Sequence, residues 1–368
     1  MKMYKKMLVA LLFAMPAMAL HAQDVAQQDT VIKAKVPALM PGRWSVEKAH
    51  AWYNQYKWIN GADFIPSTAI NQLEMWQADT FDPATIDKEL GWAESIGFNT
   101  MRVFLHSLAW KQDPKGFKER VNKYLAIADK HHIKTLFVFF DDCWNPNPKI
   151  GKQQEPTVGK HNSGWAQDPG YMVTKEEDFA YLEKYVKDIL TSFKSDKRIL
   201  LWDLYNEPGN SKKKETSLPL LTRVFTWARA VNPDQPISVG LWKMEFETLN
   251  AFQLMNSDVI TYHDYEAPEW HKRVIQMLKT HGRPLICTEY MARKHKSTFV
   301  NSMPLLKTEN VGAINWGLVA GKTNTMYAWD EPRPDGTEPP LWFHEVFRND
   351  GTPYKQEEVD IIKKLNGK

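Results

Sequence analysis

The sequence predicts a single (β/α)₈ barrel with long loops after the third and eighth strands. Short apolar segments alternate with longer amphipathic segments along the chain, eight of each. Strict alternation favours parallel strands joined by right-handed helical crossovers, and a count of eight favours a closed barrel over an open sheet. In addition, no glycine-rich nucleotide-binding motif and no repeat of 20 to 50 residues interrupts the pattern.

The predicted strands are short and apolar, with little alternation between apolar and polar residues. This pattern is typical of strands that are buried on both faces. They cover residues 61–65, 99–105, 134–140, 199–206, 236–241, 258–265, 284–289 and 311–318.

The predicted helices carry apolar residues at three- and four-residue steps. Ser45 caps a short helix that runs to Trp52, ahead of the barrel. The first barrel helix begins at Asp82 and Pro83 and ends at Gly97. The others cover residues 117–131, 176–193, 218–230, 247–255, 268–279, 298–306 and 355–365. Two connections, 141–171 and 320–354, are longer than a barrel needs, and both follow strands, on the face where barrel enzymes place their chemistry.

The N-terminus has the layout of a secretory signal peptide. Three lysines precede the apolar run 7–20, which is too short to span a bilayer and is followed by the small residue Ala22. We therefore expect a signal peptide over 1–22, a polar tether over 23–44 and a catalytic domain over 45–368, with an N-terminal membrane anchor as the alternative. The expected mature protein is exported, periplasmic or secreted, without stable membrane insertion, and monomeric.

Removing the signal also removes three lysines and no acids, which takes the formal charge from +3 to zero. A neutral chain predicts no nucleic-acid partner. The two cysteines, Cys143 and Cys287, lie in strand-like runs far apart in the sequence, and we expect two free, buried thiols.

Two predicted strands end in a carboxylate. Strand four ends in Asn206, Glu207 and Pro208, and strand seven ends in Glu289 followed by Tyr290. A single rim glutamate can be solvated or paired with an arginine. Two at the same rim of one barrel, however, have the arrangement that glycoside hydrolysis uses.

These strand ends resemble those of clan A glycoside hydrolases, especially family 5. The segment 202–208 resembles the Asn-Glu-Pro signature of strand four, and Thr288-Glu289-Tyr290 resembles the nucleophile segment of strand seven. Further matches are Arg102 on strand two, His263 and Tyr265 on strand six, and Trp316 on strand eight. The chain departs from the family at the end of strand three, where many endoglucanases carry a histidine and this chain reads Asp141-Asp142-Cys143-Trp144.

The resemblance implies double displacement with retention of configuration and requires no cofactor. Glu289 would be the nucleophile and Glu207 the acid/base, with their carboxyl groups roughly 5 to 5.5 Å apart. It also implies that Arg102 and Tyr265 hold Glu289 ionised and that the charge of Glu289 raises the pKa of Glu207. Asn206 would bind the sugar 2-hydroxyl.

The 15 tryptophans exceed what a core requires, and an indole can stack on the apolar face of a sugar. Trp316 is the expected platform beneath the cleaved sugar. The expected cleft wall consists of Trp76, Trp144, Trp165 and Trp329, and further contacts to sugar hydroxyls are expected from Glu74 and His106. Trp92, Trp227 and Trp270 lie in predicted helices and are expected to pack, and Asp203 is expected to pair with an arginine or lysine.

Two other functions remain open at this point. One is a carbohydrate-binding pseudoenzyme that keeps the cleft without turnover. The other is a metal-dependent barrel hydrolase that uses Asp141, Asp142, His106 and His263, although the clan's mechanism needs no metal. The substrate expected is a carbohydrate, with a plant-type β-1,4-linked glycan as the favoured class. Sugar configuration, endo or exo action and the role of Asp141 and Asp142 stay open.

Overall fold

The computed structural model describes residues 39–170 and 176–368. Its centre is an eight-stranded parallel sheet in the order β5-β4-β3-β2-β1-β8-β7-β6. A backbone bridge between Leu241, just after β5, and Tyr262 of β6 joins the two ends of this order, so the sheet is a nearly closed barrel. The strands are β1 Asn60–Asp63, β2 Thr100–Phe104, β3 Lys134–Asp141, β4 Ile199–Asn206, β5 Ile237–Ser238, β6 Ile260–His263, β7 Leu285–Glu289 and β8 Gly312–Asn315. The predicted fold class is confirmed.

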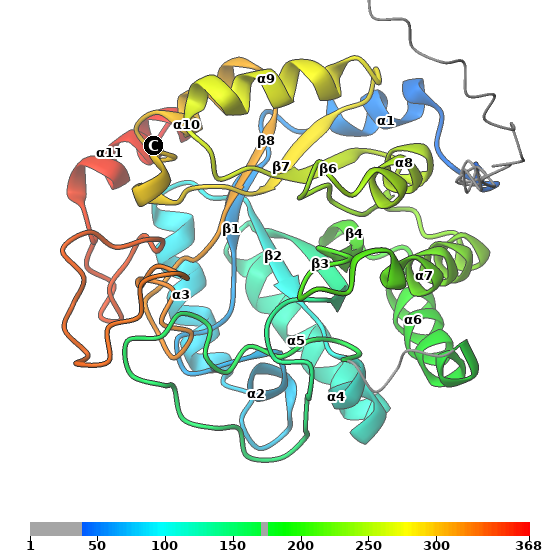
Figure 1. Cartoon of the computed structure of the whole chain (residues 1–368), viewed down its shortest axis with the longest axis horizontal. Helices are drawn as coiled ribbons and strands as arrows, with labels where there is room; N and C mark the ends of the chain where they lie inside the picture. Colours follow the sequence, from blue (N-terminus) through cyan, green and yellow to red (C-terminus); the bar gives the residue numbers. More distant parts are fainter. Residues whose placement is uncertain (1–38, 171–175) are drawn as a thin grey trace, which may run out of the picture. The chain divides into compact units, whose positions relative to one another are not determined.

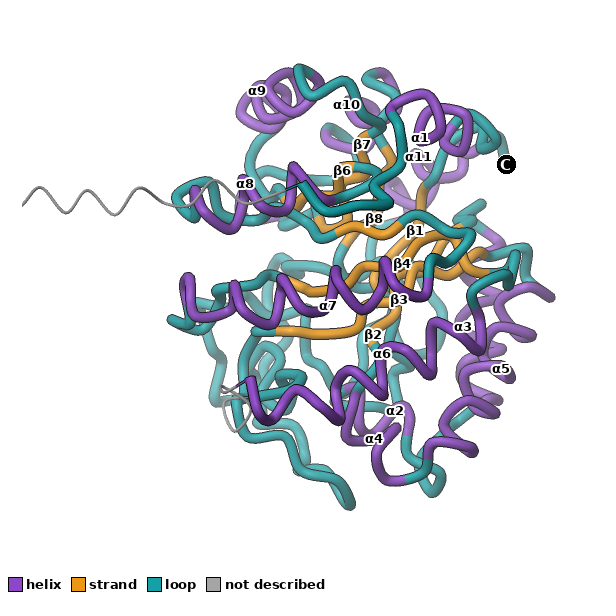
Figure 2. The backbone as a smooth tube through the Cα atoms, turned by 90° about the vertical axis from the view of Figure 1, so that its right-hand side faces the viewer, coloured by secondary structure: helices purple, strands orange, loops and turns teal. Residues whose placement is uncertain are grey.

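Helices surround the strands, as Figures 1 and 2 show. They are α1 Val46–Tyr53, α2 Gln72–Trp76, α3 Pro83–Ser95, α4 Ser107–Gln112, α5 Pro114–Lys130, α6 Phe179–Phe193, α7 Leu218–Val231, α8 Glu247–Asn256, α9 Pro268–Lys279, α10 Ser302–Thr308 and α11 Gln356–Asn366. Ser45 caps α1 by accepting a hydrogen bond from the Lys48 amide, and Asp82 caps α3 through the Thr85 amide, as the sequence predicts.

Two short helices, α2 and α4, lie in segments that the sequence predicts to be loops. At α2, the Asn71 side chain accepts from the Glu74 amide, and the Glu74 carboxylate accepts from the Ile70 amide. This reciprocal arrangement resembles a capping box, except that Glu74 binds the amide one residue before the N-cap Asn71. Both helices are shorter than two turns, so no helical period could develop in the sequence. They place Trp76 and Ser107 inside the protein.

The core has two large clusters of buried side chains. One contains Leu136, Val138, Leu201, Ile286 and Ile314 on the strands, together with side chains of α1 and of the loops. A second, larger cluster fills the space between the strands and the surrounding helices. Cys143 and Cys287 are free and buried, as expected.

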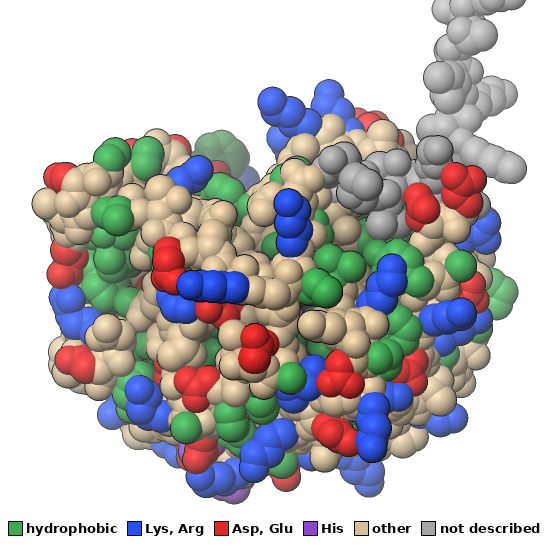
Figure 3. Space-filling view, turned by 90° about the horizontal axis from the view of Figure 1, so that it is seen from below, with side chains coloured by type: hydrophobic (Ala, Val, Ile, Leu, Met, Phe, Trp, Pro, Cys, Tyr) green, Lys and Arg blue, Asp and Glu red, His purple; other side chains and the backbone are tan. Residues whose placement is uncertain are grey.

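The expected signal peptide and most of the expected tether lie outside the described residues. Of the tether, residues 40–44 contact the barrel: the Met40 amide donates to Asn256 and the Trp44 amide to Asp258. Within residues 39–170 and 176–368, no helix has the length and apolar composition needed to cross a membrane. On the face shown in Figure 3, acidic and basic side chains are interspersed.

Candidate active site

The register of the parallel strands brings polar side chains together at one rim of the barrel. Arg102 on β2 pairs with Asp63 on β1, and Asn206 on β4 pairs with Asp141 on β3. On the other side of the barrel, Glu289 at the end of β7 pairs with His263 on β6. Glu207 follows β4 directly with a φ of 45°, a left-handed conformation that is costly in residues other than glycine.

Arg102 is the centre of this group, and its side chain is fully buried. One guanidinium nitrogen donates to Asp63 and to Glu289, at 2.8 Å each. The other terminal nitrogen donates to Asp203 at 2.8 Å and to Asn206 at 2.7 Å. Arg102 therefore positions the Glu289 carboxylate and neutralises part of the buried negative charge. The expected pairing of Asp203 with an arginine is confirmed.

Glu289 has partners at both carboxylate oxygens. Oε1 accepts from Arg102, and Oε2 accepts from the Tyr265 hydroxyl at 2.7 Å. His263 Nδ1 lies 3.4 Å from Oε2. Hydrogen bonds that are directed at an ionised carboxylate stabilise its charged form and fix its orientation.

Glu207 is also held at both oxygens. Oε1 lies 2.9 Å from His263 Nδ1, and Oε2 accepts from the Cys143 thiol at 3.2 Å and from the Asn210 amide. Burial lowers the pKa of His263 to about 4, so its imidazole is neutral near pH 7. Because Nδ1 faces two carboxylates, we assign its single ring hydrogen to Nδ1. His263 thus links the two glutamates.

Burial is the main cause of the pKa shifts at both glutamates, and it raises both pKa values. At Glu289, His263, Arg102 and the Tyr265 hydrogen bond oppose this rise. At Glu207, hydrogen bonds from Cys143 and Asn210 oppose it. The charge of Glu289 was the expected cause of the raised pKa of Glu207, whereas removal from water is the largest cause in the structure.

Asp141 fixes the orientation of two neighbours. It accepts from the Asn206 amide at 2.9 Å and from the Trp165 indole at 2.7 Å. Burial raises the pKa of Asp141 to about 6. Since Asn206 Oδ1 is already bound to Arg102, the two bonds leave the amide one orientation. Asp142 has a different role: it accepts from Tyr205, Gly209, Ser217 and Lys213 and thereby anchors the loop after β4.

These groups open onto a cavity of about 1310 Å³, including its open mouth, which we call the active-site cavity. Its lining contains both rim glutamates, and several aromatic side chains come from different loops. The lining residues are Cys143, Trp144, His161, Asn162, Trp165, Asn206, Glu207, Asn210, Ser211, Trp242, Tyr265, Glu289, Trp316, Trp329 and His344. The structure thus brings Trp144, Trp165, Trp316 and Trp329 to the cavity.

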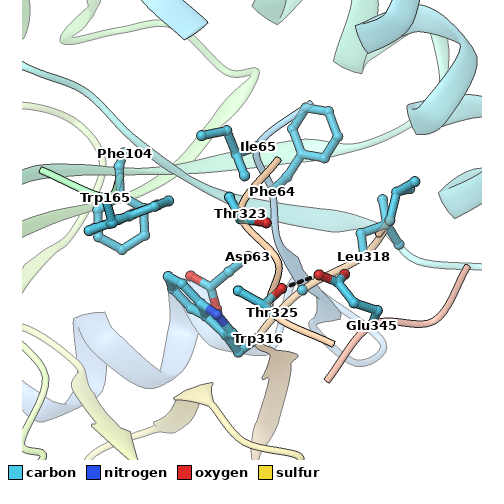
Figure 4. A pocket seen from close by; sticks show the side chains of 12 residues that line it. Asp63, Phe64, Ile65, Phe104, Trp165, Trp316, Leu318, Thr323, Thr325 and Glu345 are labelled. Atoms are coloured by element: carbon cyan, nitrogen blue, oxygen red, sulfur yellow. Dashed lines mark hydrogen bonds between the residues drawn. The ribbon is translucent and has the colours of Figure 1, made fainter. Parts of the chain in front are cut away.

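A smaller pocket adjoins the cavity, because Trp165 and Trp316 line both. Figure 4 shows these two indoles together with Asp63, Thr325 and Glu345. The Thr325 hydroxyl donates to Glu345, and burial raises the pKa of Glu345 to about 8. Trp316 is further held by edge-to-face contacts with Phe104 and Trp165, at ring separations of 5.9 and 5.4 Å.

Three expected substrate contacts are wrong in position, because their side chains do not line the cavity. Trp76 is fully buried among Phe81, Phe117 and Tyr124, and its indole donates to the Phe104 carbonyl. Glu74 caps α2 and pairs with Lys322. His106 is buried, with its ring nitrogens bonded to the Leu108 amide and the Gln167 carbonyl. Sequence position after a strand did not reveal that α2 and α4 turn these side chains inward.

Among the helix tryptophans, Trp92 and Trp227 pack as expected, but Trp270 does not. Its side chain is 58% exposed at the start of α9, with the Arg273 guanidinium over its ring. Several lining residues were not named in advance as site residues: Cys143, His161, Asn162, Asn210, Ser211, Trp242 and His344. Cys143, Asn210 and Trp242 carried a usable signal, since each lies just after a strand whose end faces the rim.

One group of side chains in the described part of the chain has the spacing of a metal site. Ligand atoms of Glu207, His263 and Glu289 all lie within 4.8 Å of one another. The metal-site alternative named Asp141, Asp142, His106 and His263, and of these four only His263 belongs to this group. Asp141, Asp142 and His106 are bonded to protein donors and backbone groups. The group with metal-like spacing therefore consists of the two rim glutamates and the histidine that links them.

A parallel barrel with two glutamates at the ends of β4 and β7, above an aromatic floor, defines a glycoside hydrolase that acts on O-glycosidic bonds. The chain belongs to the cellulase family, glycosyl hydrolase family 5, whose family model matches residues 93–322. Comparison with curated protein sequences found no match.

Solved structures with the same fold include β-1,4-mannanases and a β-1,4-mannosidase. An endo-1,4-β-D-mannanase from Thermotoga petrophila is 15% identical with a TM-score of 0.53, over 85% of this chain and 99% of that chain. An exo-β-1,4-mannosidase from an Opitutaceae bacterium is 16% identical with a TM-score of 0.57, over 84% and 59%. A Bifidobacterium longum protein in complex with Manb1-4GlcNAc is 12% identical with a TM-score of 0.57, over 84% and 78%. Likeness at these identities is evidence for the fold alone.

Proposed function

We propose that this protein is a retaining β-glycoside hydrolase in which Glu289 is the nucleophile and Glu207 the acid/base. The observation that supports this most is the spacing of the two carboxylates. One carboxylate oxygen of Glu207 lies within 4.8 Å of a carboxylate oxygen of Glu289. Retaining enzymes hold their carboxyl groups about 5 to 5.5 Å apart, whereas inverting enzymes leave roughly 6.5 to 9.5 Å for a water molecule between them.

In the first step, Glu289 Oε attacks the anomeric carbon while Glu207 protonates the glycosidic oxygen, which leaves with the aglycone. Arg102 and Tyr265 keep Glu289 ionised and aimed, because both donate to its oxygens. Burial keeps Glu207 protonated at higher pH than an exposed glutamate would be. In the second step, Glu207 removes a proton from water, which displaces Glu289 from the sugar with net retention.

Asn206 and Trp316 are the proposed contacts to the sugar that stays on the enzyme. The Asn206 amide is locked between Arg102 and Asp141 and faces the cavity, where it can bind the 2-hydroxyl as positive charge develops at the anomeric carbon. Trp316 lies in the floor and offers an indole face to the apolar side of the ring. Trp144, Trp165 and Trp329 complete the proposed aromatic lining.

The proposed substrate is a β-linked glycan or an oligosaccharide derived from one, met after export of the protein. Since structures of similar fold include β-1,4-mannanases and a β-1,4-mannosidase, manno-configured substrates belong in the test beside gluco, galacto and xylo compounds.

The test is a panel of β-linked aryl glycosides and polysaccharides, with wild-type protein, Glu289→Gln and a chelator arm. Turnover that persists with chelator and disappears in Glu289→Gln supports the proposal and excludes both the pseudoenzyme and the metal-dependent hydrolase. Full activity in Glu289→Gln would contradict it. NMR of the first-formed product should show the β-anomer from a β-substrate.

A further inference from the structure

We propose that the active-site cavity is closed at its glycone end, so that the enzyme removes sugar from the non-reducing end of a chain instead of cutting within it. This inference rests on the proposed function, because the roles of Glu207 and Glu289 define which side of the cavity holds which part of the substrate.

The acid/base defines the leaving-group side. Glu207 must stand beside the glycosidic oxygen that it protonates, so the aglycone leaves over the loops after β4 and β5. Those loops contribute Asn210, Ser211 and Trp242 to the cavity. The sugar that stays bound to Glu289 lies over Trp316, and any longer glycone would have to extend the other way, toward the loops after β1, β3 and β8.

The long loops after β3 and β8 are joined by hydrogen bonds across that direction. Figure 1 shows them in green and orange. The contacts are from the Asn162 amide to the Thr323 carbonyl, from the Arg333 amide to the Gly159 carbonyl, and between His161 Nδ1 and the Tyr327 carbonyl, each 2.8 Å long. Asn162, His161 and Thr323 are buried, so this junction excludes solvent.

The loop after β1 completes the rim between the other two. The Lys322 amide donates to the Ser67 carbonyl at 3.1 Å, and the Asn71 side chain donates to the Gly164 carbonyl at 2.8 Å. Three loops from different parts of the chain therefore form a continuous hydrogen-bonded barrier. A groove for a longer glycone would have to break these bonds.

Aromatic rings form the inner side of this barrier. His161 lies between Trp144 and Trp329, at ring separations of 5.5 and 6.2 Å, and 5.6 Å from His344. The Tyr265 ring, whose hydroxyl holds Glu289, is 5.3 Å from Trp329. Trp329 of the barrier therefore contacts Tyr265, the residue that orients the nucleophile. Trp144 and Trp329 are 37% and 38% exposed, and their exposed parts lie at the mouth of the active-site cavity.

The deciding experiment uses a β-1,4-linked hexasaccharide, built from whichever sugar the aryl glycoside panel identifies, with a fluorescent label at its reducing end. We expect the early products to contain a single labelled species, shortened from the non-reducing end by one fixed length. The same hexasaccharide blocked by a methyl ether on the 4-hydroxyl of its non-reducing end should resist cleavage. A mixture of labelled lengths at early times, or cleavage of the blocked chain, would overturn the inference.

A pair of glycine variants tests the barrier itself. Gly159 has φ of 65°, and a Cβ there would lie 1.7 Å from the Arg333 carbonyl oxygen, whereas Gly151 has φ of 94° and nothing within 4 Å. Gly159→Ala should separate the two loops and allow cleavage of the blocked hexasaccharide, while Gly151→Ala should leave the wild-type pattern. A folded Gly159→Ala protein, verified by circular dichroism, that still rejects the blocked chain would contradict this role for the contact.

The outcomes separate the inference from the proposed function. If no glycoside is hydrolysed, or if Glu289→Gln keeps its activity, the proposed function fails and the inference fails with it. If Glu289-dependent hydrolysis occurs within chains, only the closed glycone end is wrong. Should Gly159→Ala not fold, the product pattern of the wild-type enzyme still decides.

Discussion

At the scale of single residues, Arg102 has the largest influence on the geometry of the site. Its guanidinium binds three carboxylates and the Asn206 amide from a fully buried position. A buried charge without a partner is costly, so each of these groups depends on the others. The same side chain therefore supports both the fold and the nucleophile.

Replacing Arg102 by Met should destabilise the protein by about 3–5 kcal/mol, because it leaves buried carboxylates unpaired. Chemical denaturation followed by circular dichroism measures this effect. Lys115→Met is the control, since Lys115 is 90% exposed in its ion pair with Glu119, and a loss of less than about 0.5 kcal/mol is expected. Equal stability of the two variants would show that the buried ion pairs contribute little.

The pH dependence of the reaction follows from the two glutamates. We expect a bell-shaped profile of kcat/KM, with activity lost at low pH as Glu289 is protonated and at high pH as Glu207 loses its proton. Because the pair is coupled, the two apparent pKa values belong to the pair, and burial moves them upward. His263 has a pKa of about 4 and stays neutral through most of this range.

Glu207→Gln should abolish the high-pH limb with an aryl glycoside whose leaving group needs no protonation, and should lower turnover of poor leaving groups by about 10²- to 10⁴-fold. Steady-state kinetics over pH with both kinds of substrate measure this. If the high-pH limb of the kcat/KM profile is unchanged in the variant, a group other than Glu207 causes it.

At this scale, the residues that could be predicted were those at strand ends. Arg102, Asn206, Tyr265, Glu207 and Glu289 all lie where the strand assignments placed them. The bonds from Arg102 and Tyr265 to Glu289 are as the resemblance implied, whereas the bond between Arg102 and Asn206 was not predicted. The contacts of Cys143 and Asn210 with Glu207 could not be predicted, because they depend on the path of two loops.

At the scale of elements, the end of β8 and the start of its loop provide the floor of the site. Trp316 follows Asn315, the last residue of β8, and its ring is held between Phe104 and Trp165. The indole is 9% exposed, so most of its surface is covered by protein and the remainder faces the cavity. The position of the Trp316 ring in the cavity therefore depends on where β8 ends.

Trp316→Ala should lower kcat/KM by roughly tenfold or more, which corresponds to about 1.4 kcal/mol of lost transition-state binding. The matched control is Trp270→Ala, because that indole is 58% exposed on α9 and does not line the cavity. Kinetics and thermal melting of both variants give the answer. If Trp316→Ala fails to fold, the residue is primarily a core residue.

The length of an element decided whether it could be predicted from the sequence. The long, periodic helices and the buried strands were predictable because each repeats a pattern over several residues. The short helices α2 and α4 have no room for such a pattern. Asn71 and Glu74 have the spacing of a capping signature but no apolar period follows them, and the cap His106 is recognisable only from its hydrogen bond. Trp76, Glu74 and His106 were misplaced for this reason.

At the scale of the whole molecule, the barrel buries several acidic groups away from solvent. Burial raises the pKa of Glu345 to about 8 and the pKa values of Glu89 and Asp168 to about 7. Between its ordinary pKa of 4.5 and its folded value, Glu345 keeps its proton in the folded state and loses it in the unfolded state. The free energy of unfolding therefore falls as pH rises through this range.

Glu345→Gln removes one of these titrations while keeping an oxygen that can accept from Thr325. The variant should gain melting temperature relative to wild type at pH 8, by roughly 2 °C or more, and gain less at pH 5. Glu119→Gln, at a side chain that is 67% exposed, is the control and should show no such difference. An equal effect of Glu345→Gln at both pH values would contradict a protonated Glu345.

For the molecule as a whole, the alternation of apolar and amphipathic segments was enough to predict the barrel and the rim that carries the two glutamates. How the long loops meet did not follow, because Gly159 and Arg333, or His161 and Tyr327, are far apart in sequence and share no pattern. The shape of the cavity depends on those contacts and could only be seen in three dimensions.

The central claim, that Glu289 forms a covalent glycosyl intermediate, is tested most directly by trapping that intermediate. A 2-deoxy-2-fluoro-β-glycosyl fluoride of the preferred sugar slows the second step, because fluorine destabilises the oxocarbenium-like transition state while fluoride still leaves readily. Mass spectrometry of the digested protein should find one added sugar on the peptide that contains Glu289. An active enzyme that gains no sugar, or gains it on any other residue, would contradict the account.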